Sequence, residues 1–587
     1  MGRWNAYSIL AVSTQNLINP KLMQNIYLVL LSGIALGFAQ LALATTPPNI
    51  LLILTDDQGY GDVGFNGNPH VKTPKLDRLA ANSVIFDRLY ASPFCSPTRA
   101  ALMSGRYAYR TGVLSTQAGL SLLRPSEVTI AETLQSAGYR TGLFGKWHLG
   151  DNAPTRPVDQ GFERSLMHVG GMIGAPYSLL DAQSYFDTVL IDDGIEKRFD
   201  GYCVDVFTDA AIDFIHASKQ DPFFIYYAPN TPHHPLTVSD HYAQPYRDAG
   251  FSEQTSRYYG MITNIDDNFG RILDALDANG QMDNTLIIFL GDNGTSSLHK
   301  QNDLWECGLR GRKSFVYENG IRVPAFIKLP NSTSKGKRHE SITCVEDILP
   351  TILDICQLQT RVQLDGISLL PLLNGSKNKL PQRSHFIQVH GGTSPERYRH
   401  FAAFNDTYKL LQAVGRGGEA YSLETAKFEL YDITKDPEEQ HDISAKYPQV
   451  VQQLKAEYDR WFDAVGSDGF APVKIWIGSE VQNPVHLSRQ DWQHAGLFDG
   501  DLGFYDLEVK SAGTYRITCR WSELLKKTHK VVLKIGDQVF ENNILYAESE
   551  CHFEALELAA GPCRFEAWVE IDGQSQGFRF IEIEKID

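Results

Sequence analysis

Continuous apolar runs alternate with amphipathic segments through the first two thirds of the chain. The runs inside 49–57, 222–235 and 284–294 carry five or more apolar residues before a polar turn, which is typical of strands buried on both faces. Residues 257–280 have helical periodicity and end in glycine. This alternation predicts an α/β fold with a mostly parallel sheet sandwiched between helices.

Local sequence features predict where helices begin and which of their residues face solvent. Thr73 followed by Pro74 is typical of a helix start, with Thr73 as the N-cap and proline in the first turn. Residues 129–150 predict a helix, a glycine stop and a short strand. Asp266 and Asp267 lie in the middle of a predicted helix, and we expect them on its solvated face.

The pattern changes twice towards the C-terminus. Beyond residue 380 the helical crossovers thin out, and 428–444 predicts a strand with an acidic turn before a helix at 447–465. From residue 470 onwards, short alternating strands are divided by Gly and Pro turns, which predicts an all-β, sandwich-like module. We therefore expect a signal region (1–44), a catalytic α/β domain (45–380), a smaller antiparallel α+β subdomain (381–466) and a C-terminal β-module (467–587).

The N-terminus has the features of an export signal. Lys21 precedes an apolar run that ends in Ala42-Leu43-Ala44, a small-residue cleavage pattern. Cleavage would leave an exported protein, periplasmic or extracellular, without a membrane segment. The alternative is a membrane anchor, because the run is nearly long enough to span a bilayer. Translation starting at Met23 is also open, since residues 1–20 are unusual for a signal.

Charge and cysteine content narrow the function. The formal net charge of −16 argues against nucleic acid as a partner, because backbone binding needs clustered Lys and Arg. Any anion site must therefore be positive locally. Export permits disulfides among the eight cysteines, and Cys551 with Cys563 or Cys344 with Cys356 are candidate pairs, although connectivity stays open.

Polar side chains gather where the predicted strands end. In open α/β sheets, ligands bind beyond the carboxyl ends of the strands, so we expect these side chains at one site. Carboxylate and amide oxygens suit Ca²⁺ or Mg²⁺, and calcium tolerates irregular geometry better. The residues that follow the four strands are Asp56 and Asp57, Lys146 and His148, His233 and His234, and Asp292 and Asn293.

The stretch "FCSPTRAALMSGRY" at 94–107 contains a candidate nucleophile. Ser96 can cap a short helix and Pro97 suits its first turn, which would place Cys95 at the helix N-terminus. That position favours anions and activates thiols. Arg99 lies one turn further on and can reach back towards Cys95. The arrangement is typical of an anion-handling nucleophile.

These motifs resemble the type I, formylglycine-dependent sulfatases of the alkaline-phosphatase superfamily. "CSPTRAALMSGRY" matches the C-x-P-x-R signature, and "GYRTGLFGKWHLG" resembles the second sulfatase signature. "NILLILTDDQGYGD", "NTPHHPL", "FLGDNG", "RGRKSFVYENGIRVP" and "ELYDITKDPEE" occur in the family's order, so the resemblance covers residues 49–465.

The resemblance implies a role for each matched residue. Cys95 would be oxidised to formylglycine by a formylglycine-generating maturation enzyme, and its hydrate would be the nucleophile. Arg99 would hold the hydrate, His233 would protonate the leaving alcohol and His148 would accept the proton that expels sulfate. Lys146 and Lys313 would surround the sulfate with these histidines. One Ca²⁺ would be bound by Asp56, Asp57, Asp292, Asn293 and the modified Cys95.

Several positions depart from the family pattern or remain open. Arg312 and Ser314 flank Lys313 where many members have glycines, which puts substrate fit in doubt, and "YENG" replaces Glu-Gly-Gly nearby. His441 stands where Asn is usual and is expected to be structural. His168, His234 and His299 are expected to be loop histidines, while Trp305 and Tyr317 are candidates for either sugar stacking or ordinary packing.

The resemblance implies release of inorganic sulfate from a sulfated substrate, a small molecule or a glycan. Export and the added β-module favour a sulfated carbohydrate. One alternative is a phosphoester or phosphonate monoester hydrolase of the same superfamily. Another is a secreted carbohydrate-binding protein that has lost catalysis, which the filled catalytic positions disfavour.

Overall fold

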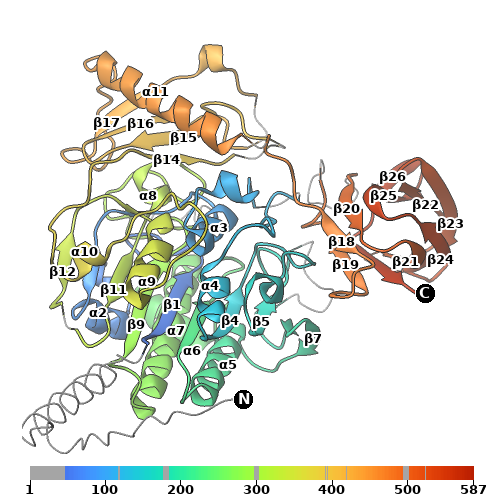
Figure 1. Cartoon of the computed structure of the whole chain (residues 1–587), viewed down its shortest axis with the longest axis horizontal. Coiled ribbons are helices and arrows are strands. Elements are labelled where there is room, and N and C mark those ends of the chain that lie inside the picture. The colour runs from blue at the N-terminus through green and yellow to red at the C-terminus, as the bar shows by residue number, and fades with distance from the viewer. Residues whose placement is uncertain are drawn as a thin grey trace, which may run out of the picture. The chain divides into compact units, whose positions relative to one another are not determined.

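A ten-stranded sheet forms the centre of the first two thirds of the chain in the computed structural model (Figure 1). The structure describes residues 47–587 apart from 117–118, 176–183, 297–302, 333, 391, 393, 418–419, 468, 494–501 and 522–523, so the expected signal segment lies outside the described residues. The strand order is β12 (Lys337–His339), β2 (Val84–Phe86), β11 (Ala325–Lys328), β9 (Thr285–Gly291), β1 (Asn49–Thr55), β8 (Phe223–Ala228), β4 (Arg140–Lys146), β5 (Arg164–His168), β6 (Val189–Asp192) and β7 (Ile195–Arg198).

Strand β1 shows why the central strands are apolar throughout. It pairs in parallel with β8 and β9, and alternate side chains point to opposite faces of the sheet. Leu52 packs in one core with the helices on one face, and Leu51 packs in a second core with those on the other. The first face is covered by α3 (Cys95–Ser104), α4 (Ile130–Ser136) and α9 (Ile348–Cys356), the second by α2 (Pro74–Ala80), α5 (Cys203–Ala217) and α7 (Glu253–Ala278). The predicted α/β sandwich is confirmed.

The start of α2 confirms one local prediction and corrects another. Thr73 is the N-cap residue and Pro74 lies in the first turn, as expected, although the Thr73 side chain makes no capping hydrogen bond. The carboxylate of Asp266, from the middle of α7, instead accepts hydrogen bonds from the backbone N–H of Lys75 (3.0 Å) and Leu76 (2.8 Å). Asp266 is fully buried rather than solvated, because a tertiary contact satisfies the free amides at the helix start.

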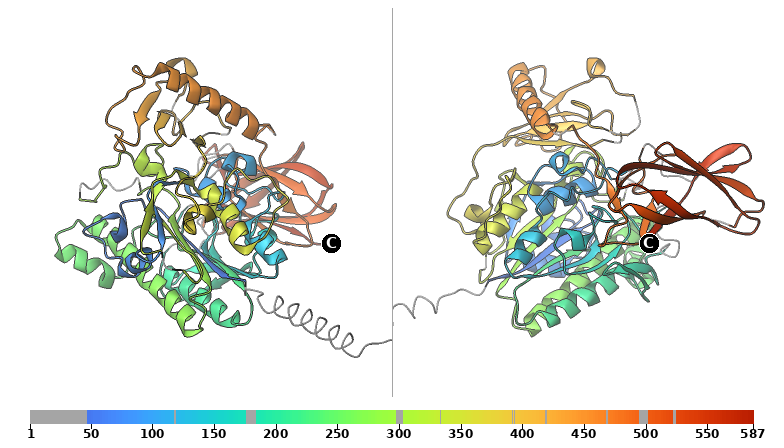
Figure 2. Two further views of the ribbon diagram at one scale, coloured as in Figure 1. Left: turned by 60° about the vertical axis from the view of Figure 1, so that its left-hand side comes forward. Right: turned by 45° about the vertical axis from the view of Figure 1, so that its right-hand side comes forward.

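A smaller antiparallel sheet follows the catalytic sheet in the chain. Its strands are β14 (His385–Gln388), β15 (Phe401–Phe404), β16 (Tyr408–Gln412) and β17 (Glu429–Asp432). Helix α11 (Pro448–Val465) lies along one face of this sheet in both views of Figure 2. It packs there through Tyr458 and Trp461. The other face packs against Tyr90 of the short sheet formed by β10 (Arg322–Val323), β3 (Leu89–Tyr90) and β13 (Thr343–Cys344).

The C-terminal residues form two facing β-sheets around one apolar core. One sheet has β18 (Ile475–Ile477), β20 (Tyr505–Val509), β25 (Gly561–Ile571), β22 (His529–Ile535) and β23 (Gln538–Ile544), with β26 (Gln574–Gly577) beside β25. The other has β19 (Val485–Ser488), β27 (Phe580–Lys585), β21 (Gly513–Arg520) and β24 (Glu550–Leu558). The predicted all-β sandwich is confirmed, and we call residues 475–587 the C-terminal module.

Two further observations concern disulfides and membrane-spanning helices. All eight cysteines are free, so neither candidate disulfide forms in the structure. Cys551 and Cys563 lie on β24 and β25, which belong to different sheets, and this explains why their closeness in sequence does not pair them. Within residues 47–587 as described, no helix combines the length and the apolarity needed to cross a membrane.

Candidate active site

The ends of β1 and β9 bring the predicted metal ligands together. The two strands pair in parallel with Thr55 opposite Gly291, so the residues that follow them leave the sheet side by side. The backbone N–H of Asp57 donates to Asp292 Oδ1 at 3.0 Å, and Asn293 Nδ2 donates to Asp57 Oδ1 at 2.9 Å. Asp57 adopts φ 66°, a left-handed conformation that turns the chain sharply at this edge. Asp56, Asp57, Asp292 and Asn293 are all fully buried.

Cys95 is the first residue of α3 and lies among these acids. Its Sγ and one carboxylate oxygen each of Asp56 and Asp292 lie within 4.8 Å of one another. The expected cap is wrong by two residues: Phe94 is the extended N-cap, and Ser96 is inside the first turn without a capping role. The shift leaves Cys95 at the helix N-terminus, as expected. Burial raises the pKa of the Cys95 thiol, so the helix position alone does not make it a thiolate.

Each buried carboxylate lies closest to a different cationic side chain, and Arg99 also lies 3.9 Å from Asp56 Oδ1. Lys146 Nζ lies 2.8 Å from Asp56 Oδ2, Lys313 Nζ lies 2.5 Å from Asp57 Oδ1, and Arg99 Nη2 lies 2.8 Å from Asp292 Oδ2. Arg99 also donates to the Lys146 carbonyl (2.9 Å) and to the Tyr226 hydroxyl (3.2 Å). The three acidic and three basic side chains together have no net charge, so a bound divalent cation would make the site net positive. This explains how a protein of net charge −16 can attract an anion here.

Three oxygen atoms of the site have no hydrogen-bond partner. They are Asp56 Oδ1, Asp57 Oδ2 and Asn293 Oδ1, each inaccessible to solvent. A buried oxygen without a partner carries a desolvation penalty that a hard cation would remove. The donor set of carboxylates and one amide therefore fits Ca²⁺ better than a metal that prefers nitrogen or sulfur.

His148 and His233 lie beside different members of this cluster, Cys95 and Asp57. His148 Nδ1 lies 3.3 Å from Cys95 Sγ, and its Nε2 lies 2.9 Å from the carbonyl oxygen of Thr116. Because a carbonyl only accepts, the proton of neutral His148 sits on Nε2 and leaves Nδ1 free to accept. Burial, followed by the charges of Lys146 and Arg99, holds the pKa of His148 well below its usual range. Neutral His148 thus presents a base to Cys95.

His233 has the opposite orientation. Its Nδ1 lies 2.7 Å from the His234 carbonyl and its Nε2 lies 3.7 Å from Asp57 Oδ2. Burial lowers the pKa of His233 to about 3, even though Asp57 favours the charged form. His234 stacks on His233 with ring centroids 4.2 Å apart and is half-buried.

The structure adds two residues that sequence patterns did not assign to the site. His168, expected as a loop histidine, is the buried last residue of β5 and pairs in register with Lys146, and its Nε2 has no hydrogen-bond partner. Its place after an apolar strand segment could have indicated this. Gln490, from the C-terminal module, lies 3.4 Å from His148 Nε2 through its Nε2, and no sequence feature marks it. Tyr317 packs in an apolar core, and His299 lies outside the described residues.

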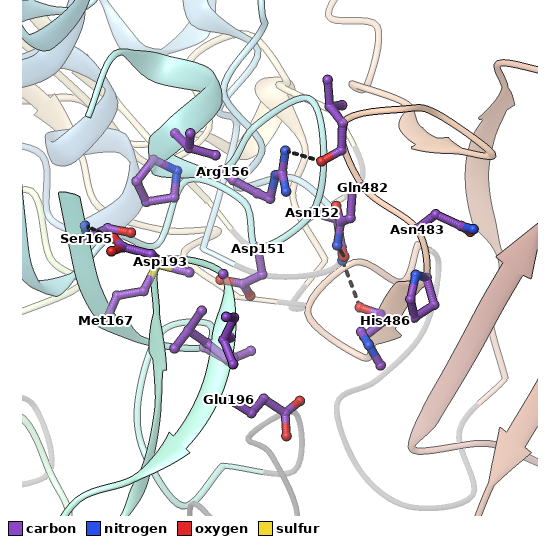
Figure 3. Close-up of a pocket in the computed structure, with 18 of the residues that line it drawn as sticks. Asp151, Asn152, Arg156, Ser165, Met167, Asp193, Glu196, Gln482, Asn483 and His486 are labelled. Atoms are coloured by element: carbon purple, nitrogen blue, oxygen red, sulfur yellow. Dashed lines mark hydrogen bonds between the residues drawn. The ribbon is translucent and has the colours of Figure 1, made fainter. Parts of the chain in front are cut away.

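The large cavity in Figure 3 lies apart from this chemistry. It has a volume of ≈ 870 Å³ and is lined by residues 151–169, by the β6–β7 hairpin and by the C-terminal module, but not by Cys95 or its acidic neighbours. Asn152 donates to the His486 carbonyl at 2.8 Å across it. The location of the candidate active site therefore rests on its side-chain chemistry rather than on cavity size.

Comparisons with known proteins agree with this chemistry. The sulfatase family model matches residues 48–358, more than half of the chain, and a model for the C-terminal part of N-sulphoglucosamine sulphohydrolase matches 309–462. Arylsulfatase A of Homo sapiens is 32% identical over 487 residues, covering 73% of this chain and 89% of that protein. N-acetylgalactosamine-6-sulfatase of Mus musculus is 32% identical over 357 residues, covering 56% of this chain and 67% of that protein.

A solved structure is similar over the same part of the chain. The crystal structure of Ps i-CgsB in complex with k-i-k-neocarrahexaose is 28% identical with a TM-score of 0.62, and the match covers 71% of this chain and 93% of that one. The family match and the human relative both agree with the fold and the site described above. The chain therefore belongs to the sulfatase family of the alkaline-phosphatase superfamily and is a sulfuric ester hydrolase.

Proposed function

We propose that this sulfatase releases sulfate from a sulfated carbohydrate, using a formylglycine made from Cys95 and one Ca²⁺. The observation that carries the proposal is the position of Cys95, at a buried helix N-terminus within 3.3 Å of a base and beside carboxylates with unpartnered oxygens. When bound, the Ca²⁺ and the formylglycine hydrate supply a Lewis acid and a nucleophilic hydroxyl. Asp56, Asp57, Asp292 and Asn293 would hold the ion, together with the modified side chain of Cys95.

The cationic side chains would bind the sulfate group. Lys146 and Lys313 already lie against the acids, so a cation at those acids would release their charge towards the substrate's oxygen atoms. Arg99 is fixed by contacts with Asp292, the Lys146 carbonyl and Tyr226, which makes it a rigid positive group one helical turn from Cys95. These groups stabilise the negative charge that grows on the sulfate oxygens in the transition state.

The two histidines divide the proton transfers. His148 Nδ1 has a free lone pair directed at Cys95 and would accept the proton whose removal expels sulfate. His233 would protonate the leaving alcohol from Nε2. Because its pKa is about 3 in the free site, this role requires the bound sulfate ester, whose negative charge beside Nε2 favours the protonated imidazole.

The substrate class rests on the relatives and on export. One relative is named for N-acetylgalactosamine 6-sulfate chemistry, and the similar solved structure holds k-i-k-neocarrahexaose. The small-residue site Ala42-Leu43-Ala44 favours release to the periplasm or outside the cell, where sulfated glycans occur. Maturation would require a formylglycine-generating enzyme in the same host.

The test is ester hydrolysis by the full chain co-expressed with a formylglycine-generating enzyme. Conversion of Cys95 is checked by peptide mass, and sulfate and phosphate release are compared on matched aryl esters, with Cys95→Ala as the control. We expect sulfate release to exceed phosphate release and to disappear in Cys95→Ala. Dominant phosphate release would overturn the proposal in favour of a phosphoester or phosphonate monoester hydrolase. Sulfated mono- and oligosaccharides would then be screened for the natural substrate.

A further inference from the structure

A loop of the C-terminal module reaches the candidate base of the active site. The loop follows β19, and its residue Gln490 is only 2% exposed. Gln490 Nε2 donates to the Thr116 carbonyl (2.8 Å) and to Ser121 Oγ (2.8 Å). The backbone carbonyl of Gln490 accepts from Gly119 N–H (2.9 Å). One glutamine therefore binds the segment 116–121 of the catalytic part at three points.

The Thr116 carbonyl is also the partner of His148. It lies 2.9 Å from His148 Nε2, while Gln490 Nε2 is 3.4 Å from the same ring atom. Both amide hydrogens of Gln490 are already donated to Thr116 and Ser121, so His148 Nε2 has no donor left to accept from. Its N–H must point at Thr116, and the free lone pair stays on Nδ1, 3.3 Å from Cys95 Sγ. The position of one carbonyl thus selects the tautomer of the base.

The module also contacts residues that follow His148 in the chain. Trp476 N–H donates to the Ala153 carbonyl (2.8 Å), and Gln482 Oε1 accepts from Ala153 N–H (2.7 Å). Gln482 Nε2 further donates to Asn152 Oδ1 (3.1 Å). Leu122 packs in the apolar core of the module. The module is therefore attached to residues 119–122, before His148 in the chain, and to residues 152–153, after it, and the contacts at 152–153 do not touch the His148 ring or the Thr116 carbonyl.

We propose that the C-terminal module completes the active site, with Gln490 as the positioning residue that holds Thr116 and thereby orients His148. The proposal rests on the proposed function, because it assigns His148 the second proton transfer. It contrasts with a module that only retains glycan, since removing a glycan-binding surface would leave turnover of a small aryl ester unchanged.

The test compares two glutamines of the same interface in the full chain. Gln490→Leu removes the contact to Thr116, whereas Gln482→Leu removes interface hydrogen bonds that do not touch His148 or its carbonyl. We expect Gln490→Leu to lower kcat for an aryl sulfate about 10–100-fold with KM nearly unchanged. The released alcohol should appear as a first-turnover burst ahead of sulfate, because only the second proton transfer is slowed. Gln482→Leu should lower Tm and keep kcat.

A double-mutant cycle separates positioning from general damage. In a His148→Ala background, Gln490→Leu should have no further effect on kcat, because the residue it orients is gone. Equal effects of Gln490→Leu and Gln482→Leu on kcat, or a full effect of Gln490→Leu in His148→Ala, would overturn the proposal. If the unsubstituted enzyme releases no sulfate from any ester, the proposed function fails instead, and the two failures are distinguishable.

A second, independent observation concerns a buried cluster outside this site. Cys344 Sγ, a carboxylate oxygen of Glu346 and a ring nitrogen of His385 lie within 4.8 Å of one another, and all three residues are buried. Glu346 Oε2 has no hydrogen-bond partner and lies 3.7 Å from His385 Nε2. His385 Nδ1 lies 3.3 Å from the Tyr107 hydroxyl, so Nε2 is the nitrogen that faces the cluster.

Arg383 is the basic residue whose charge acts on all three groups of this cluster. Its guanidinium is already paired, because Nη1 donates to Asp347 Oδ1 at 2.7 Å. A divalent ion bound by a thiolate, a carboxylate and a neutral imidazole would make a site of zero net charge, which burial favours. A cavity of ≈ 30 Å³, lined by Glu346, His385 and Tyr107 among others but not by Cys344, has room for one water molecule beside the carboxylate and the imidazole.

We infer that Cys344, Glu346 and His385 bind a zinc ion that links the catalytic part to the antiparallel sheet at β14. The mixed sulfur, nitrogen and oxygen donors favour zinc over the calcium expected at Cys95. The test is metal analysis of the purified full chain after expression with added zinc and dialysis against a weak chelator. We expect one zinc per chain, absent from Glu346→Gln and Cys344→Ser but retained in the matched variant Cys563→Ser.

Cobalt substitution keeps the test decisive if a variant fails to fold. Co²⁺ bound to the unsubstituted protein should show the near-ultraviolet charge-transfer band of a cobalt–thiolate bond. A zinc-free protein after expression with zinc, zinc retained by a folded Cys344→Ser variant, or bound cobalt without a thiolate band would overturn the inference.

Discussion

Two buried groups of charged side chains, one around Cys95 and one around Lys409, differ in what their oxygen atoms contact. Lys409 Nζ on β16 lies 3.0 Å from Glu318 Oε1 and 2.9 Å from Glu439 Oε1. The remaining oxygens accept from the Tyr90 hydroxyl (3.0 Å) and from Glu318 N–H (2.7 Å). One carboxylate oxygen of this network, Glu439 Oε1, has no hydrogen-bond partner, but it lies 2.9 Å from Lys409 Nζ. The cluster around Cys95 has three oxygens without a hydrogen-bond partner, and Arg99 and His233 lie further from two of them, at 3.9 Å from Asp56 Oδ1 and 3.7 Å from Asp57 Oδ2.

The difference separates a structural polar core from a ligand site. Burial of charge is common to both, so burial alone does not indicate function. The Lys409 network is complete within the chain and joins α8 (Glu318–Ile321) to the antiparallel sheet. The cluster around Cys95 is incomplete, and the missing partners are those that a hard cation and an anionic ester would supply. Substitutions in the two groups should therefore affect different measurements.

The largest expected effect is the loss of turnover in Asp57→Asn. This change removes a carboxylate whose Oδ2 is unpartnered and which pairs with Lys313, so both the ion and the sulfate-binding lysine lose their fixed position. We expect kcat/KM for an aryl sulfate to fall by about 10²–10³-fold or more. Calcium should raise Tm of the unsubstituted protein by mass action but not that of the variant.

The matched control is Asp209→Asn on α5. It makes the same change from carboxylate to amide at an exposed residue that is not part of the cluster around Cys95. Full turnover by Asp57→Asn, or an unchanged calcium-dependent rise in its Tm, would contradict the assignment of Asp57 as a metal ligand.

The next effect is on stability, through Lys409→Met. Removing the lysine leaves the buried carboxylates of Glu318 and Glu439 facing each other with only Arg322, 3.8 Å from Glu318 Oε2, as a cation, which costs about 3–5 kcal/mol of unfolding free energy. Denaturant unfolding with calcium held constant measures this cost. The kcat of the folded fraction should stay unchanged, because the network does not touch Cys95. A variant in which Glu318→Gln and Glu439→Gln accompany Lys409→Met should recover most of the stability, and failure to recover would contradict the electrostatic explanation.

The sequence predicts which side chains gather at the candidate active site because these residues follow strands. Asp56 and Asp292 come directly after apolar runs, and parallel pairing of those runs must bring their ends to one edge. Asp266 was mispredicted for the opposite reason. Helical periodicity places it in mid-helix, but only the packed structure shows that the start of α2 lies against it. Its partner is 190 residues away, so no local pattern contains the information.

Gln490 shows the same limit at the active site itself. It is 342 residues from His148 and lies in a module whose alternating strands predict a sandwich but not its docking surface. Strand periodicity specifies which side chains face the core of the module. It does not specify which loop meets the catalytic part, because that depends on the shapes of two surfaces built from distant segments.

The smallest expected effect tests a third kind of buried group, the carboxyls Asp151 and Asp491 at the docking surface of the module. Each has one unpartnered oxygen, as in the cluster around Cys95, but the hydrogen bonds of their other oxygens come from neutral groups. Burial, followed by the charge of Asp491, raises the pKa of Asp151 to about 8, and burial raises that of Asp491 to about 7. Protonation, rather than an ion pair or a metal, therefore relieves this pair.

The sign of the resulting pH dependence follows from proton binding. With a folded-state pKa of about 8 against an ordinary value of 3.8, the folded protein binds more protons than the unfolded chain between these limits. Stability is then greatest at low pH within this window and is lost as pH rises through 8. Asp151→Asn removes the titration, so its Tm should fall less than that of the unsubstituted protein between pH 6 and 9. At pH 9 the variant should be more stable by about 1–3 kcal/mol. Thermal unfolding at constant calcium measures this difference, with Asp209→Asn as the control. If Tm of Asp151→Asn and of the unsubstituted protein fell equally with pH, the raised pKa of Asp151 would be contradicted.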